Sequence, residues 1–555
     1  MNLTEVLLEK SLITPEQLSE AVRVHKADGL RMDQALLSLG YVSERQLLEV
    51  VGEQFDFPVI DLAGYRVEDA AIKALPSKFV YRKRLMPIAR HNGTLDVATS
   101  DAFDPYVFDE MRLMTGLTIR PVLAPSDEID KLIKAHYGVG GDTVDEMVGT
   151  NGDQVDLRAG SDDTQDLLEM AQEASVIKLV NEIILEAIHE RASDIHIEPY
   201  EHNLSIRYRI DGVLQDAAVP PQIHRFQAAI ISRLKILANM NIAEKRLPQD
   251  GRIKFAVDGR QIDVRVSVIP MLFGEGIVMR ILDKDNVLIG LEQLGMAGEA
   301  YGRFQELITR PHGIILVTGP TGSGKTTTLY AALNAIVGPD KKVLTVEDPV
   351  EYHLDGVNQI PVDHKVGMSF GMGLRAILRH DPDVVMIGEI RDLETAQAAT
   401  QAALTGHLVL STLHTNDSAS AATRLIDMGV EPFLVSSTLI GAMAQRLVRR
   451  ICPECKVEVD PSTMNLPADA PTDAAFYEGA GCRACRDVGY KGRMGIYELL
   501  TMNNQLAEKI MTRSPAHELV EAGRLSGLKL LREDGWHRVR QGDTTVEEVL
   551  RVTAG

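Results

Sequence analysis

The stretch GIILVTGPTGSGKTTTLYAALNAI, residues 313–336, decides the fold of this chain. Its apolar start predicts a buried strand, which leads into the pattern GPTGSGKT, residues 319–326, and then into a helix. Glycines in such a loop let backbone N–H groups close around phosphates, and the start of the helix adds a favourable dipole. A strand, a glycine loop and a helix in this order predict a nucleotide-binding α/β domain with a P-loop.

The loop supplies two further kinds of contact for a nucleotide. Lys325 is expected to reach the β and γ phosphates of ATP, and the Thr326 hydroxyl is expected to hold Mg²⁺. The phosphate-binding residues predicted from the loop are Gly319, Pro320, Thr321, Gly322, Ser323, Gly324, Lys325, Thr326 and Thr327.

Three further apolar runs end in residues that suit phosphate chemistry. KVLTVED ends in Glu347 and Asp348, VVMIGE ends in Glu389, and LVLSTLH ends in His414. In a doubly wound parallel sheet, functional groups gather at the carboxyl ends of the strands, so these side chains are expected to converge on the nucleotide. The position where nucleotide-hydrolysing folds usually carry an aspartate is Gly388 here, and a divided set of acids replaces it.

Composition excludes several classes of protein. With 555 residues, 45% of them hydrophobic, the chain is long enough for about three or four globular domains. A formal net charge of -21 argues against nucleic acid as a partner, because neutralising phosphates needs clustered Lys and Arg. No apolar run approaches the ~18–20 residues that cross a bilayer, and the start MNLTEVLLEK lacks the features of a secretory signal. We expect a cytoplasmic protein, at most peripheral on a membrane.

The N-terminal part of the chain contains an internal repeat. Residues 7–22, LLEKSLITPEQLSEAV, match residues 36–51, LLSLGYVSERQLLEVV, at an offset of 29 residues. Each copy restarts a helix with a capping box, in which Thr14 or Ser43 is followed three residues later by Gln. The repeat predicts two helical hairpins, and residues 1–62 are interpreted as a surface that docks another protein.

The next segments differ sharply in composition. Residues 63–137 mix strand-like and helical patterns, which predicts a small α/β part that completes an N-terminal docking module over residues 1–137. Residues 138–165 are rich in Gly and Asp and poor in large apolar residues. That composition is typical of a flexible acidic linker.

The strands that follow the linker carry arginines. In IDVRVSV the apolar residues alternate with Asp263, Arg265 and Ser267, so Arg265 is expected on the solvent-facing side of a half-buried strand. A strand face of this kind meets either an anion or only water, and the pattern alone leaves both interpretations open.

The four cysteines form two CxxC pairs. Cys452 with Cys455 and Cys482 with Cys485 are separated by 26 residues. Two such pairs with no spare cysteine predict a tetrahedral Cys₄ zinc site. A redox dithiol is the alternative, although neither pair lies in a thioredoxin-like βαβ pattern. The predicted domains after the linker are a strand-rich domain, the nucleotide-binding domain, a zinc subdomain and a helical C-terminal domain, at residues 166–290, 291–450, 451–497 and 498–555.

Several long motifs resemble the type II/IV secretion ATPase superfamily. VTGPTGSGKTTTLY, LTVEDPVEY, LRHDPDVVMIGEIRD and LTGHLVLSTLHTND look like its Walker A motif, Asp box, Walker B motif and His box. NIAEKRLPQDGRI, AMAQRLVRRICPEC and GDTTVEEVLRVT are similar to motifs of the type II secretion assembly ATPases, called general secretion pathway protein E. The resemblance runs from about residue 166 to the end of the chain.

The resemblance implies a RecA-like P-loop ATPase domain that works in a homo-hexamer, preceded by a PAS-like α/β domain. It implies that Glu347 activates the attacking water, that Glu389 supports Mg²⁺ and the water, and that His414 senses the γ phosphate. Arg265 and Arg280 match the charge-neutralising arginines of the family, which favours an anion opposite that strand face. Such roles suit phosphoryl transfer, which depends on positioning and charge stabilisation.

The function that the resemblance implies is a motor ATPase that uses ATP, Mg²⁺ and Zn²⁺. It would drive pseudopilus assembly and protein export by the type II secretion system, at the cytoplasmic face of the inner membrane. Its implied partners are the platform proteins of that membrane, namely the cytoplasmic domain of the L component and the F component. One alternative is a type IV pilus extension ATPase, which shares every catalytic motif, and another is a nucleic-acid translocase, which the acidic charge disfavours.

A cyclic-di-GMP receptor is a further interpretation of the repeat in residues 1–62, because it resembles the N-terminal domains of some pilus ATPases. The motifs of those domains open with Arg-Leu-Gly, whereas this chain has NLTEVLL in the first copy and RMDQALL in the second. Cyclic-di-GMP binding is therefore not expected, and protein docking is preferred.

Overall fold

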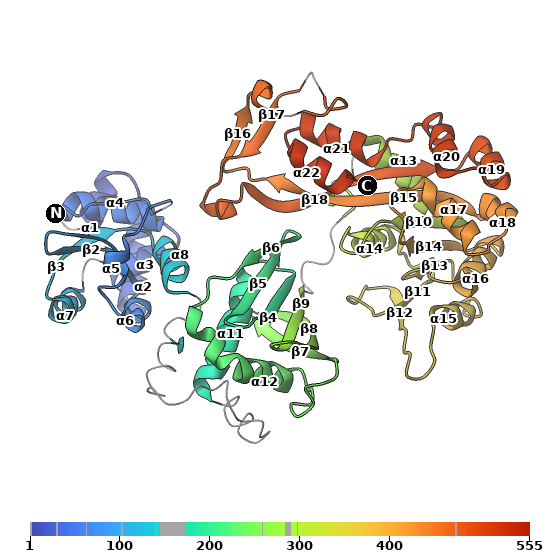
Figure 1. Ribbon diagram of the computed structural model, residues 1–555. Helices are drawn as coiled ribbons and strands as arrows, with labels where there is room; N and C mark the ends of the chain where they lie inside the picture. The colour runs from blue at the N-terminus through green and yellow to red at the C-terminus, as the bar shows by residue number, and fades with distance from the viewer. Residues whose placement is uncertain are drawn as a thin grey trace. The chain divides into compact units, whose positions relative to one another are not determined.

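The computed structural model separates into two compact units (Figure 1). One unit comprises Met1–Phe255 with Asp263–Ile281, and the other comprises Ala256–Ile262 with Leu282–Gly555. The predicted linker lies almost entirely outside the described residues. The structure describes residues 3–28, 31–62, 64–101, 104–138, 140, 143–144, 173–257, 259–283, 290–296, 298–464, 466–471 and 474–554.

The repeat folds as four helices. They are α1 (Leu3–Glu9), α2 (Pro15–Asp28), α3 (Met32–Ser38) and α4 (Glu44–Phe55). Both capping boxes form, with the N–H of Gln17 donating to Thr14 Oγ1 and that of Gln46 donating to Ser43 Oγ, each over 3.3 Å. Equivalent positions of the two copies meet in one apolar core, which includes the pairs Leu7 and Leu36, Ile13 and Val42, and Ala21 and Val50. Each copy therefore covers the apolar face of the other.

A three-stranded sheet follows the repeat, with β1 antiparallel to β2 and β2 parallel to β3. Its strands are β1 (Leu85–His91), β2 (Thr94–Thr99) and β3 (Thr118–Leu123). The neighbouring helices are α5 (Asp69–Ile72), α6 (Ser77–Lys83), α7 (Pro105–Thr115) and α8 (Ser126–Tyr137). Leu95 and Val97 of β2 pack in one core with Met111 of α7 and Ile129 of α8, so the segment is a small α/β structure.

The rest of this unit is built on a six-stranded sheet in the order β6-β5-β4-β9-β8-β7. The strands are β4 (Asp194–Pro199), β5 (Leu204–Ile210), β6 (Val213–Asp216), β7 (Gln249–Val257), β8 (Arg260–Met271) and β9 (Gly274–Asp283). Helix α11 (Ala174–His189) packs on the sheet, where the Tyr208 hydroxyl of β5 donates to the carbonyl oxygen of Ile183 over 3.1 Å. Along β8 the apolar residues Val264 and Val266 are buried while Arg265 between them is not, as the alternation predicted.

The second unit is built on a seven-stranded sheet in the order β12-β11-β13-β14-β10-β15-β18. Every neighbouring pair is parallel except β15 and β18, which pair antiparallel. The strands are β10 (Gly313–Thr318), β11 (Val343–Glu347), β12 (Val357–Pro361), β13 (Val384–Ile387), β14 (Leu408–Leu413), β15 (Leu439–Ile451) and β18 (Tyr490–Thr501).

Helices cover both faces of this sheet. Ile315 and Val317 of β10 enter a core with residues of α13 (Gly298–Ile308) and α14 (Lys325–Ile336). Ile314 and Leu316 enter the opposite core. The helices of that second face are α15 (Phe370–Ile377), α16 (Leu393–Leu404), α17 (Ala419–Asp427) and α18 (Pro432–Thr438). This doubly wound arrangement confirms the predicted α/β class with a P-loop domain.

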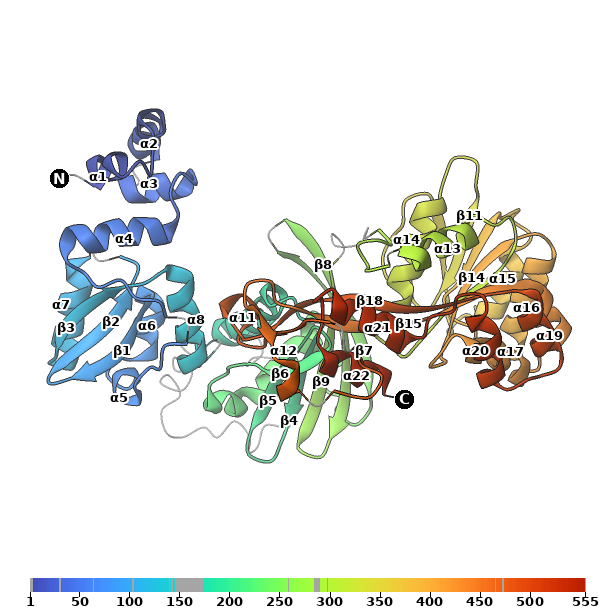
Figure 2. The same cartoon turned by 90° about the horizontal axis from the view of Figure 1, so that it is seen from above.

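The C-terminal part extends from the edge of that sheet. β10 pairs with β15 only as far as Ala444, and beyond it β15 continues with β18 as a two-stranded ribbon (Figure 1, Figure 2). A hairpin of β16 (Lys456–Val459) and β17 (Phe476–Gly479) lies between them in sequence. The closing helices are α19 (Asn504–Met511), α20 (Ala516–Arg524), α21 (Leu531–Arg540) and α22 (Val546–Thr553). Within the described ranges, no helix has both the length and the apolar character needed to cross a membrane.

Candidate active site

Two glycines of the phosphate loop combine a positive φ with close neighbours. Gly319 and Gly324 have φ values of 144° and 89°, a region that disfavours any side chain. A Cβ on Gly319 would lie 2.7 Å from the carbonyl oxygen of Gln445, and one on Gly324 would lie 2.8 Å from the side-chain nitrogen of the same residue. β15, which carries Gln445, therefore packs directly against the loop and limits its shape.

Two buried polar side chains of the loop suit an anion. The Lys325 ammonium donates to two carbonyl oxygens of its own loop over 2.8 and 3.0 Å. Burial lowers the pKa of Lys325, while the nearby Glu389 favours the charged form. Ser323 is 3% exposed, and its Oγ has no hydrogen-bond partner among the described residues. A cation, an orphaned hydroxyl and the N-terminus of α14 together fit the phosphates of a nucleotide.

The other predicted loop residues belong to the same turn. They are Pro320, Thr321 and Gly322 in the loop, with Thr326 and Thr327 in the first turn of α14.

Glu347 ends β11 and is held by three uncharged donors. Its side chain is 3% exposed. Oε1 accepts from Thr345 Oγ1 over 2.5 Å and from Gln359 Nε2 over 3.1 Å, and Oε2 accepts from the Tyr330 hydroxyl. Burial, together with the charge of Glu347, raises the pKa of Tyr330 well above its usual range, which keeps that hydroxyl a donor.

Glu389, in contrast, has an arginine and a histidine as its partners. Arg391 Nη2 is 2.5 Å from Glu389 Oε1, and His414 Nε2 is 3.3 Å from Oε2. The hydrogen bond to Glu389 raises the pKa of Arg391. Because β11, β13, β14 and β10 are successive neighbours in the sheet, Glu347, Glu389, His414 and the loop gather at one carboxyl edge, as predicted.

Gly388 occupies a crowded position between two of these strands. Its N–H donates to the carbonyl oxygen of Val346 over 2.8 Å. A Cβ there would lie 3.3 Å from the Phe370 ring and 3.5 Å from the Cα of Glu347. An aspartate at position 388 would therefore place a second carboxylate beside Glu347. The Phe370 ring would leave little room for its side chain.

Two other polar residues of these motifs make local contacts. Asp348 Oδ2 lies 3.1 Å from His364 Nε2. His407 Nδ1 lies 2.8 Å from the carbonyl oxygen of Ala402, which ties this histidine to the end of α16.

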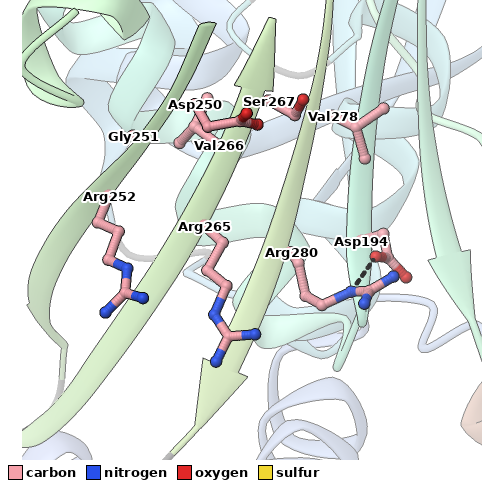
Figure 3. A pocket seen from close by; sticks show the side chains of 9 residues that line it. All are labelled: Asp194, Asp250, Gly251, Arg252, Arg265, Val266, Ser267, Val278 and Arg280. Atoms are coloured by element: carbon pink, nitrogen blue, oxygen red, sulfur yellow. Dashed lines mark hydrogen bonds and ion pairs between the residues drawn. The ribbon is translucent and has the colours of Figure 1, made fainter. Parts of the chain in front are cut away.

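Arg265 and Arg280 lie on the six-stranded sheet, where they line a pocket of about 490 Å³ together with Arg252 (Figure 3). The three arginines come from the neighbouring strands β8, β9 and β7. Arg280 Nε donates to Asp194 Oδ1 over 3.0 Å, and Asp250 is a second acid of the pocket. The concentration of guanidinium groups suits an anion with several oxygens.

Sequence reasoning missed four side chains at these sites: Tyr330, Gln359, Arg391 and Arg252. Arg252 gives a usable signal, because it precedes a buried isoleucine in a strand of alternating character. Arg391 stands two residues after Glu389 in the quoted motif. Tyr330 and Gln359 give no signal, since they meet Glu347 only after the sheet has formed.

The four cysteines meet in one cluster, as predicted. All four Sγ atoms lie within 4.8 Å of one another. Three of the Sγ pairs are 3.7 Å apart. Two sulfurs that each lie ~2.3 Å from a tetrahedral zinc are ~3.8 Å apart, whereas a disulfide measures ~2.05 Å. The cluster therefore fits four thiolate ligands around one metal ion.

The hairpin β16–β17 explains how two distant cysteine pairs meet. Cys455 directly precedes β16, and Cys482 follows shortly after β17. Lys456 pairs with Gly479 at the open end of the hairpin, which brings both pairs to the same place. N–H groups of Cys482 and Gly489 then donate to Cys485 Sγ, each over 3.2 Å, as is usual for a buried sulfur ligand.

Two family models match the chain. The model of type II/IV secretion system proteins matches residues 169–551, and that of the MshEN domain matches residues 55–143. The second match lies over the α/β segment that follows the helical repeat and leaves most of residues 1–62 outside it.

Two relatives align with nearly the whole chain. The type IV pilus assembly ATPase PilB of Myxococcus xanthus is 42% identical over 100% of this chain and 99% of its own length. The type II secretion system protein E of Xanthomonas campestris pv. campestris is 43% identical over 99% of this chain and 98% of its own length.

A solved structure shares the fold. The ATPase DotB of Yersinia pseudotuberculosis is 20% identical, with a TM-score of 0.51, over 68% of this chain and 93% of its own. Since the first family model spans well over half of the residues and the full-length relatives exceed 40% identity, the chain belongs to the type II/IV secretion system protein family and is an ATP hydrolase.

Proposed function

We propose that the protein is a motor ATPase that drives pseudopilus assembly and protein export by a type II secretion system. The observation that carries ATP-driven work is the meeting of Glu347, Glu389 and His414 at the sheet edge that also bears the phosphate loop. Similarity over the full length to a type II secretion system protein E supports secretion as the process that this work serves.

The proposed roles follow from the chemistry of each side chain. Lys325 and the loop N–H groups bind the β and γ phosphates, and the Thr326 hydroxyl would hold Mg²⁺, which would neutralise phosphate charge. Glu347 takes the proton of the attacking water, and Glu389 orients that water. His414, which contacts Glu389, responds to the γ phosphate.

Assembly into a homo-hexamer is part of the proposal. Arg265 and Arg280 belong to a different unit from the phosphate loop. We propose that ring formation brings such arginines to a nucleotide, where they neutralise charge that develops on the phosphates. Arg252 lines the same pocket and would contribute a third positive charge there.

The remaining parts are assigned to structure and docking. We propose Zn²⁺ as the metal of the cysteine cluster, where it would stabilise a segment of short strands. Residues 1–137 would dock platform proteins, the L component cytoplasmic domain and the F component, and so hold the motor at the inner membrane. Saturable binding of cyclic-di-GMP to the full-length protein would count against docking as the only task of this module.

The experiment that tests the function compares strains of the source organism. A deletion strain is complemented with the wild-type chain or with Lys325→Ala, and secreted proteins in the medium and pili on the cells are measured in parallel. We expect export to fail in the deletion strain and with Lys325→Ala, and to return with the wild-type chain. Loss of pili with unchanged export would favour the type IV pilus extension motor instead.

A further inference from the structure

The carboxylate of Glu347 has an environment unlike that of the other acids at the site. Both of its oxygens accept hydrogen bonds, and all three donors, Tyr330, Thr345 and Gln359, are uncharged. Among the described residues, no cationic side chain forms an ion pair with it. Glu389, by comparison, has Arg391 and His414 as partners. Neutral donors fix the direction of a carboxylate without adding the positive charge that would oppose proton uptake.

The Tyr330 hydroxyl is itself held in place. Tyr330 is 1% exposed and lies in α14, the helix that begins at Lys325. Its ring meets the ring of Tyr352 edge to face, with centroids 4.5 Å apart and planes at 87°. The tyrosine therefore joins the helix of the phosphate loop to the acid at the end of β11.

The Gln359 amide is fixed from two further directions. Its Oε1 accepts from the N–H of Leu354 over 2.8 Å, and its Nε2 donates to the carbonyl oxygen of Tyr352 over 3.1 Å. These two bonds determine which end of the amide faces Glu347, so Nε2 is the donor to the carboxylate.

We propose that Tyr330 and Gln359 are positioning residues that hold the Glu347 carboxylate for its part in activating water. The inference rests on the proposed role of Glu347. The two side chains reach the carboxylate from α14 and from β12, the neighbour of β11 in the sheet, and Gln359 Nε2 also lies 3.4 Å from the Tyr330 hydroxyl oxygen. Losing one of these charge-assisted hydrogen bonds holds the carboxylate less firmly, and a misplaced base loses rate and not substrate affinity.

The test uses the full-length protein, with the Mg-ATPase rate measured at one protein concentration and nucleotide affinity measured separately. For Tyr330→Phe and Gln359→Met we expect kcat to fall about 10- to 100-fold, while KM and ADP affinity change less than about twofold. Tyr301→Phe is the matched control, because it removes a tyrosine hydroxyl that contacts Gln305 beside the same core. The control should keep the wild-type kcat.

A double-mutant cycle separates this inference from the function on which it rests. In a Glu347→Gln background, Tyr330→Phe should lower kcat no further, because it acts only through that carboxylate. An equal loss in both backgrounds would overturn the positioning role while leaving the role of Glu347 intact. Wild-type turnover of Glu347→Gln alone would instead remove the proposed base, and the positioning role with it.

A higher kcat in Tyr330→Phe would also overturn the inference, since the tyrosine hydroxyl would then be holding the Glu347 carboxylate away from the reaction. If Tyr330→Phe lowers the melting temperature strongly, Gln359→Met carries the same cycle.

Discussion

The charged residues at the sheet edge differ in the kind of partner that each one has. Glu347 is buried among neutral donors, whereas Glu389 is shared between Arg391 and His414. Lys325, whose pKa is lowered by burial, satisfies its ammonium with loop carbonyls. These carbonyl contacts are weaker partners than phosphate oxygens, so a nucleotide can replace them.

Lys325→Ala removes the charge that holds the β and γ phosphates. We expect hydrolysis to be lost while the fold is kept, because the deleted bonds join Lys325 only to its own loop. The ATPase rate and the thermal midpoint of the purified variant check this. Lys342→Ala, at an exposed position of the same unit, should behave like wild type in both assays. Normal hydrolysis by Lys325→Ala would contradict the proposed function.

Glu389→Gln keeps the size of the side chain and removes its charge. We expect turnover to fall by about 10²-fold or more with ATP binding preserved, the usual result when a positioning acid is neutralised. Rapid-quench turnover and fluorescent-nucleotide binding measure the two effects. An unchanged rate would show that the acid between Arg391 and His414 has only a structural task.

At the scale of residues, sequence reasoning succeeds where the chemistry is local. The loop from Gly319 to Thr326 is predictable because one continuous segment both forms the turn and carries the groups proposed to bind the phosphates. Tyr330 and Gln359 are 17 and 12 residues from Glu347 in sequence and reach it only through packing of a helix and a parallel strand. Their chemistry is therefore invisible until the tertiary structure is known.

The hairpin β16–β17 explains how the two cysteine pairs come together, which the spacing of the cysteines alone does not. The segment between the pairs suits a loop by composition, yet its ends form the antiparallel hairpin β16–β17. The apolar runs predict the parallel strands well, because buried strands read as continuous hydrophobic segments. The antiparallel return of β18 beside β15 is set by long-range pairing that no local pattern signals.

Cys452→Ser or a strong chelator should release zinc and unfold the region from about residue 450 to 497. Structural zinc supplies folding free energy that short strands cannot replace. Elemental analysis and limited proteolysis check this, with Glu454→Gln, an exposed neighbour within the first pair, as the control. Less than about half an equivalent of zinc per wild-type chain, after purification without chelators, would count against the site.

In the whole molecule, the pocket lined by Arg252, Arg265 and Arg280 and the phosphate loop belong to different compact units. A charge-neutralising arginine must reach the nucleotide with a set geometry, and association of subunits is a means of imposing it. The acidic net charge of -21 also makes subunits repel one another, so association should weaken at low ionic strength.

Specific ATPase activity should therefore rise steeply with protein concentration, and Arg265→Ala should flatten the rise. Arg225→Ala, an exposed arginine that does not line the pocket, is the matched control and should follow the wild-type curve. Activity measured together with light scattering relates the rate to the oligomer. A wild-type rate that is independent of concentration in a verified monomer would contradict this account.

The ribbon of β15 and β18 has a mechanical consequence. At one end Gln445 touches the phosphate loop, and at the other Ile451 stands next to the first cysteine of the metal cluster. Strand geometry makes this arm ~20 Å long, so a rotation of ~10° at Gln445 carries its far end through ~3.5 Å. A displacement of that size exceeds the length of a hydrogen bond. A rotation of this kind would therefore turn a small displacement beside the phosphate loop into a larger one at the cysteine cluster.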